Sequence, residues 1–210
     1  HSHQKLWSLL SGGKESKIAG PIAESIFIKK SNSKSKYTKK LYMQKKIKFK
    51  YSVICHMRYS GAKGYFLAKE IASQLKDVLF IFPFENPSQE NDFNKSNFLF
   101  LPCSWETGLR EICIESDLIL IPSIWLVSVE GSLIKSCQVG KRVVAFDESI
   151  FDKKDYLKGV FYLKKELGIV GYSHAIMEIL LKKPNEKVLK NSAKNYITMT
   201  KRNLDAIMDY

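Results

Sequence analysis

From residue 49 to residue 210 the chain alternates short apolar runs with segments whose apolar residues recur every three or four positions. Apolar runs that end at Pro, Gly or polar residues are typical of buried strands, and the wider spacing is typical of helices that pack on one face. The predicted strands are 51–57, 78–84, 98–101, 118–121, 143–146 and 160–163. The predicted helices are 65–75, 105–115, 129–137, 172–181 and 186–210.

This alternation predicts an α/β fold, a doubly wound, Rossmann-like parallel sheet of about six strands with a long C-terminal helix. Residues 117–147 are its clearest part, because strand, loop, helix and strand follow one another there as a βαβ unit with a right-handed crossover. Ligands of such sheets bind beyond the carboxyl ends of the strands, close to helix N-termini. The loop from Pro122 to Gly131 is therefore the first place where we expect a site.

The composition suits a folded protein of one large domain, since 45% of the 210 residues are hydrophobic. We divide the chain into an N-terminal segment with a Lys-rich linker (1–48), a Rossmann-like domain (49–185) and a C-terminal helix (186–210). No apolar run is long enough for a membrane span, and we expect no signal peptide. The cysteines show no CxxC spacing, which favours reduced thiols of a cytoplasmic protein: Cys55, Cys103, Cys113 and Cys137.

The formal net charge of +13 comes mainly from one segment. Between Lys29 and Lys50 there are ten lysines and no acidic residue, which leaves 24 basic and 21 acidic residues elsewhere. A solvated linker is the favoured interpretation, and peripheral contact with an anionic membrane is the alternative. Nucleic acid is not an expected partner, because the folded part shows neither interleaved aromatic residues nor a recognition helix.

Two cations follow the first predicted strand directly. Arg58 and Lys63 lie in the loop that leads to the next helix, so both would project at the carboxyl edge of the sheet. A guanidinium and an ammonium in that position fit a diphosphate, although a lysine-rich chain also places cations in loops by chance. His56 and His174 show no ligand spacing and are interpreted as structural histidines.

Three motifs follow in order along the chain. Arg58 is followed five residues later by Lys63-Gly64, residues 116–123 read SDLILIPS, and residues 140–144 read GKRVV. This set resembles the C-terminal, nucleotide-sugar-binding half of GT-B fold retaining glycosyltransferases of the large family 4 type. The resemblance covers roughly residues 50–210.

The chain departs from the usual pattern of that family in the third motif region. The family places two glutamates eight positions apart, and counting from Gly140 those positions hold Val127 and Lys135. The pairs Glu130-Gly131 and Lys135-Ser136 instead resemble a variant found in some surface-polysaccharide glycosyltransferases. That likeness implies that Glu130 binds a sugar hydroxyl and Lys135 a phosphate or sugar. The alternative is that Glu130 only complements the helix dipole and that Lys135 is solvated.

The resemblance implies a metal-independent, retaining hexosyltransferase that moves a sugar from a nucleotide-diphospho-sugar to a glycan or lipid-linked acceptor in surface polysaccharide synthesis. In it, Arg58 and Lys63 are the catalytic residues, since they stabilise the charge that grows on the diphosphate without a metal or other cofactor. The implied nucleotide-sugar-binding residues are Arg58, Lys63, Pro122, Ser123, Glu130, Gly131, Lys135 and Ser136.

A GT-B enzyme holds its acceptor with a second half of about 150 residues or more, which residues 1–48 cannot supply. We therefore expect a fragment of a longer enzyme, or a protein that works with a partner, and no sugar transfer by this chain alone. The expected location is cytoplasmic, with contact at the inner face of the membrane. A non-catalytic α/β nucleotide-binding or interaction module is the alternative function.

Overall fold

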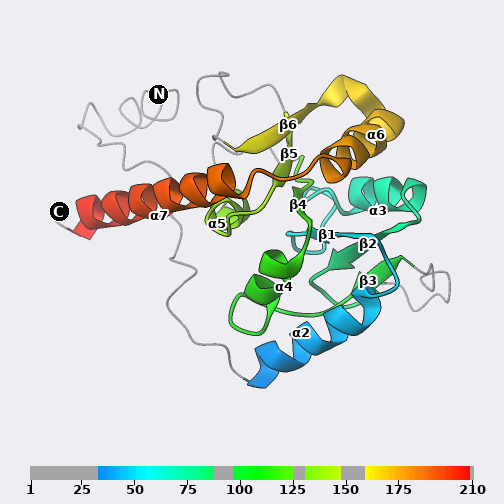
Figure 1. Cartoon of the computed structure of the whole chain (residues 1–210), viewed down its shortest axis with the longest axis horizontal. Coiled ribbons are helices and arrows are strands. Elements are labelled where there is room, and N and C mark those ends of the chain that lie inside the picture. The colour runs from blue at the N-terminus through cyan, green and yellow to red at the C-terminus, as the bar shows by residue number, and fades with distance from the viewer. Residues whose placement is uncertain (1–32, 88–96, 125–130, 148–158, 209–210) are drawn as a thin grey trace, which may run out of the picture.

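The computed structural model describes residues 33–87, 97–124, 131–147 and 159–208, which form one six-stranded parallel sheet flanked by helices (Figure 1). The strand order is β3-β2-β1-β4-β5-β6, and every neighbouring pair is parallel. The predicted doubly wound α/β sheet of six strands is confirmed. The strands are β1 (Tyr51–Cys55), β2 (Val78–Phe82), β3 (Phe98–Phe100), β4 (Leu118–Ile121), β5 (Val143–Asp147) and β6 (Val160–Lys164).

Helices cover both faces of this sheet, because alternate residues of the central strands are buried on opposite sides. One face packs against α3 and α6, and the other packs against α2, α4 and α5. α7 lies against α5 and extends beyond the body of the domain (Figure 1). The helices are α2 (Ser33–Lys46), α3 (Tyr65–Gln74), α4 (Leu109–Glu115), α5 (Gly131–Cys137), the 3-10 turn η3 (Lys165–Leu167), α6 (Gly168–Leu181) and α7 (Glu186–Met208).

Two helix starts differ from the predictions. α4 begins at Leu109 rather than at residue 105, because residues 104–108 form a turn in which Ser104 N bonds Thr107 Oγ1 at 2.7 Å and Leu109 N bonds the Ser104 carbonyl at 2.9 Å. α6 begins at Gly168, one turn before the predicted start at residue 172. From residue 49 onward each predicted strand and helix has the predicted type, and the short 3-10 turn η3 was not predicted.

The Lys-rich segment is a packed helix, so the prediction of a linker is wrong for residues 33–46. Tyr42 of α2 is fully buried, and its hydroxyl lies 2.9 Å from Ser52 Oγ and 3.2 Å from the Glu115 carbonyl. Ser35 and Thr38 are buried on the same face, since they lie one or two turns before Tyr42. Because lysines separate these buried residues, the sequence pattern did not indicate a helical face that packs on the domain. Residues 1–32 lie outside the described part of the chain.

Two lysines of α2 form ion pairs with acidic side chains that lie close to the amino end of β4. Lys39 Nζ contacts Glu115 Oε1 at 2.5 Å, and Lys46 Nζ lies 3.4 Å from Asp117 Oδ2. Asp117 Oδ2 also accepts hydrogen bonds from Ser52 N at 2.9 Å and Ser52 Oγ at 3.0 Å. These contacts hold α2 to β1 and β4 at the amino ends of the two strands.

At the carboxyl ends of the same strands, the loop after β1 touches the loop after β4. Gly64 has a positive φ of 80°, and a Cβ built there would lie 1.7 Å from the Pro122 carbonyl oxygen. Ile124 N also donates a hydrogen bond to the Ala62 carbonyl at 3.1 Å. Only glycine fits this backbone conformation and this close approach. The contact fixes the position of Lys63, the residue before Gly64.

Tyr42→Ala should lower the free energy of unfolding by about 3 to 5 kcal/mol, because it opens a cavity in a packed interface. The matched control is Tyr37→Ala on the same helix, where the side chain is 64% exposed and the change should stay within about 0.5 kcal/mol. Urea unfolding followed by circular dichroism measures both. Equal losses for the two variants would mean that α2 does not pack as described.

Gly64→Ala should cost about 2 to 5 kcal/mol of unfolding free energy, because it combines left-handed strain with a backbone clash. Gly61 in the same loop is the control, since a Cβ there has its nearest neighbour, Phe66 Cε2, at 3.5 Å and the φ is not positive. Gly61→Ala should change stability by less than about 1 kcal/mol. Thermal and urea melts of the two variants measure both changes. Equal losses of unfolding free energy would contradict the close contact of Gly64 with Pro122.

Candidate functional site

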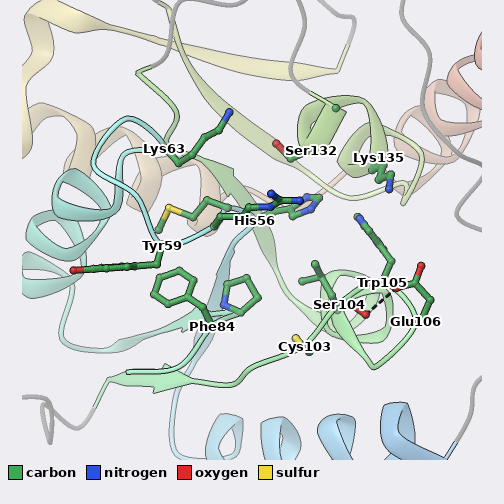
Figure 2. Close-up of a pocket in the computed structure, with 15 residues that line it drawn as sticks. His56, Tyr59, Lys63, Phe84, Cys103, Ser104, Trp105, Glu106, Ser132 and Lys135 are labelled. Carbon is green, nitrogen blue, oxygen red and sulfur yellow. Dashed lines mark hydrogen bonds between the residues drawn. The ribbon is translucent and has the colours of Figure 1, made fainter. Parts of the chain in front are cut away.

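A cavity of about 670 Å³ opens at the carboxyl ends of the central strands (Figure 2). Its walls come from the loops after β1, β2 and β3 and from the first turns of α5. The sheet order reverses between β1 and β4, and open α/β sheets bind ligands in the crevice at such a switch point. The cavity is therefore in the position where this fold places a ligand.

Cations from two separate elements border the cavity. Arg58 and Lys63 belong to the loop after β1, and Lys135 comes from the second turn of α5 (Figure 2). Glu106 is the one acidic side chain among the described residues of the lining. The lining thus carries three positive charges and one negative charge, which favours an anionic ligand.

His56 lies in the wall between β1 and α5. Its Nδ1 is 2.8 Å from Ser136 Oγ, and the ring contacts Trp105 edge to face with centroids 4.9 Å apart. Burial, helped by the charge of Lys135 and opposed by a hydrogen bond with the Ser132 backbone, lowers the pKa of His56 to about 3. His56 is thus neutral near pH 7, and it fixes α5 to the end of β1. The sequence-based interpretation as a structural histidine did not place it at the cavity.

Aromatic side chains form a further part of the wall. Trp105 lies in the turn before α4, and Lys135 Nζ is 5.8 Å from the centre of its ring, a cation–π distance. Tyr59 and Phe84 follow β1 and β2, and their ring centroids are 5.6 Å apart. None of these aromatic residues was among the predicted site residues. The one available signal was that each follows a strand end closely.

The structure brings together half of the predicted nucleotide-sugar-binding residues. Arg58, Lys63, Gly131 and Lys135 line the cavity, and Ser132, which was not predicted, lines it as well. Ser132 Oγ is buried and has no hydrogen-bond partner within residues 33–87, 97–124, 131–147 and 159–208.

The remaining predicted residues lie elsewhere. Pro122 is buried against Gly64, and it is not part of the cavity lining, nor is Ser123. Ser136 is fully buried and is not part of the cavity lining, but its hydroxyl bonds His56, which is. Glu130 and Val127 fall outside the described residues, so the assignment of Glu130 to a sugar hydroxyl stays a prediction.

The described residues contain no group of three or more His, Cys, Asp or Glu side chains that could hold a metal ion. No helix in this part of the chain combines the length with the apolar surface that a membrane span needs.

At the level of sequence, no protein-family model and no curated protein matches this chain. Several solved structures match its fold. Sucrose-phosphate synthase of Thermosynechococcus elongatus is 11% identical with a TM-score of 0.60, and the match covers 99% of this chain and 56% of that one. HepE of Anabaena in complex with UDP is 15% identical, with a TM-score of 0.57 and coverage of 86% and 54%. The UDP-forming α,α-trehalose-phosphate synthase of Burkholderia vietnamiensis is 10% identical, with a TM-score of 0.55 and coverage of 87% and 47%.

The similar structures are GT-B glycosyltransferases, and the match lies in their C-terminal half. The chain spans about half the length of the solved structures that it matches. This chain therefore has the fold of the C-terminal, Rossmann-like half of a GT-B glycosyltransferase.

Proposed function

We propose that this chain is the donor-binding part of a glycosyltransferase that takes a sugar from a nucleotide-diphospho-sugar. The observation that carries the proposal is the meeting of Arg58, Lys63 and Lys135 at one cavity beyond the central strands. A diphosphate needs concentrated positive charge and hydrogen-bond donors, and these three side chains provide both. HepE in complex with UDP and the UDP-forming synthase support a nucleoside diphosphate as the ligand class.

Arg58 and Lys63 would act on the leaving group. When the bond between the sugar and the diphosphate oxygen breaks, its electron pair stays on the diphosphate, and negative charge grows there. Positive groups fixed in advance stabilise this charge more in the transition state than in the ground state. Lys63 is held by the contact between Gly64 and Pro122, so its place beside the cavity is set by the fold. We propose these two residues as the catalytic cations of a metal-independent transfer.

Lys135 would hold the donor from the other side. His56 and Ser136 fix the helix that carries it, and the ring of Trp105 lies beside its ammonium group. The unpartnered hydroxyl of Ser132 lies on the same side and is available for a phosphate or sugar oxygen. The acceptor class, a glycan or lipid-linked molecule in surface polysaccharide synthesis, and the retaining course of the reaction belong to the proposal through the sequence resemblance.

One observation favours a second function, a non-catalytic nucleotide-binding module. The family position of the second glutamate is taken by Lys135, and Lys135 lies at the cavity. A site that keeps its cations but loses a ribose-binding carboxylate could bind a diphosphate without transferring a sugar. Nucleotide binding and sugar turnover, the latter measured with an acceptor-binding half present, separate the two functions, because the module would bind the nucleotide and show no turnover.

Replacing Arg58 and Lys63 together by Ala should weaken UDP or ADP binding by about a hundredfold or more, since two charge-assisted contacts are lost. Isothermal titration of the better of the two nucleotides, chosen by thermal shift, measures the effect. The control double variant, Lys76→Ala with Arg202→Ala, removes two exposed cations outside the cavity lining. Unchanged affinity in the Arg58 and Lys63 variant, or an equal loss in the control, would contradict the proposal.

Lys135→Ala should reduce affinity for the same nucleotide roughly ten- to a hundredfold, which corresponds to one charge-assisted contact of about 1.5 to 3 kcal/mol. Lys135→Glu should not restore binding, because a carboxylate beside the diphosphate repels it. Lys141→Ala, four residues beyond α5 and outside the cavity lining, is the control and should bind within about twofold. If Lys135→Glu binds more tightly than the parent chain, the ordinary two-glutamate pattern applies and the assigned role of Lys135 is wrong.

A further inference from the structure

The side of α2 that faces away from the domain carries both lysines and apolar side chains. Lys36 and Lys40 are exposed on it, and Tyr37, Met43 and Ile47 are 64%, 44% and 86% exposed. These positions recur every three or four residues, so they share one side of the helix, and Ile47 continues it through a bond from its N–H to the Met43 carbonyl. We call these five residues the outward face of α2.

The orientation of this face is fixed by the opposite side of the helix. Ser35, Thr38 and Tyr42 are buried against the domain, and α2 lies along the outside of α4 (Figure 1). At the border between the buried and the outward side, Lys39 forms an ion pair with Glu115 and Lys46 forms one with Asp117. The helix cannot rotate its outward apolar residues into the protein without breaking all of these contacts. Their exposure is therefore a property of the folded domain.

The outward face lies in the most basic part of the chain. Residues 29–50 contain ten lysines and no acidic residue. Lys34, Lys36, Lys40 and Lys48 are exposed, and within the described residues no acidic side chain forms an ion pair with any of them. An uncompensated positive charge of this density attracts an extended anionic surface.

We propose that the outward face of α2 binds the surface of an anionic lipid bilayer, with the helix parallel to the membrane plane. Lysines contact lipid phosphates, while Tyr37, Met43 and Ile47 enter the boundary between head groups and acyl chains. The apolar residues favour a bilayer over a nucleic acid, because a phosphate backbone would engage the lysines and leave these three side chains in water. This inference does not depend on the proposed glycosyltransferase function, and its test uses no nucleotide.

The test is co-sedimentation of the whole chain with vesicles. Vesicles of equal parts phosphatidylcholine and phosphatidylglycerol should bind the chain, and vesicles of phosphatidylcholine alone should bind at least about tenfold more weakly. Added salt should weaken binding, because the lipid charge is screened. Equal binding to the two kinds of vesicle would overturn the proposal, and so would the absence of binding to both.

Two sets of variants separate the contributions of charge and apolar contact. Lys36→Glu with Lys40→Glu should weaken binding to the anionic vesicles by about tenfold or more, as should Tyr37→Ser with Ile47→Ser. The charge-matched control is Lys187→Glu with Lys194→Glu on α7, which makes the same change in net charge at two exposed lysines and should bind within about twofold of the parent chain. An equal loss in this control would mean that net charge alone drives binding and would overturn the assignment to α2.

Two further outcomes would assign the face to a different partner. Light scattering that shows a dimer, dispersed by Tyr37→Ser with Ile47→Ser, would assign it to a second copy of this chain. If the chain binds duplex RNA but not vesicles, and the serine substitutions leave RNA binding unchanged, the face would be assigned to nucleic acid. All the substituted side chains are exposed, so the melting temperature of each variant should match the parent chain and show that the fold is intact.

Discussion

The pairing of β1 with β4 in the middle of the sheet is the constraint on which the other parts of this molecule depend. These strands are neighbours although the chain returns from one to the other through two other strands and two helices. At their amino ends, the carboxylate of Asp117 joins them through the backbone and hydroxyl of Ser52. At their carboxyl ends, the loops that follow them meet at Gly64 and Pro122. With both ends held, the loop after β1 has a fixed place beside the cavity, where it contributes Arg58 and Lys63 to the lining.

The net charge of +13 is divided among lysines with different environments. Lys39 and Lys46 help to attach α2 to the domain through acidic partners. Lys63 and Lys135 border the cavity, whose described lining contains one acidic side chain, Glu106. The exposed lysines of α2 remain in solvent beside apolar side chains. The net charge thus combines lysines in three environments: lysines paired with acidic residues of the fold, lysines placed to attract a small anion, and lysines placed to attract an anionic surface.

The sheet could be predicted from the sequence because its inner strands, β1, β2, β4 and β5, are mainly apolar runs buried on both faces, a pattern that is visible without knowledge of tertiary contacts. Arg58 and Lys63 could be found because they follow a strand directly. The contact of His56 with Ser136 could not be predicted, because it joins positions 80 residues apart and leaves no local pattern in the sequence. The helix at residues 33–46 was not predicted because lysines dominate the segment, whereas its packing depends on Tyr42, whose partners Ser52 and Glu115 belong to β1 and α4.

The contact between Gly64 and Pro122 also restricts how a protein of this architecture can change over evolutionary time. Two loops that meet backbone to backbone have fixed lengths, because an insertion in either one would separate the surfaces that touch. The loops after β2 and β3 instead face the cavity with the side chains of Phe84 and Trp105 (Figure 2). Those positions can be exchanged without moving the backbone of the switch point. A family built on this plan would therefore diversify its ligands through the second and third loops and keep the first and fourth loops constant.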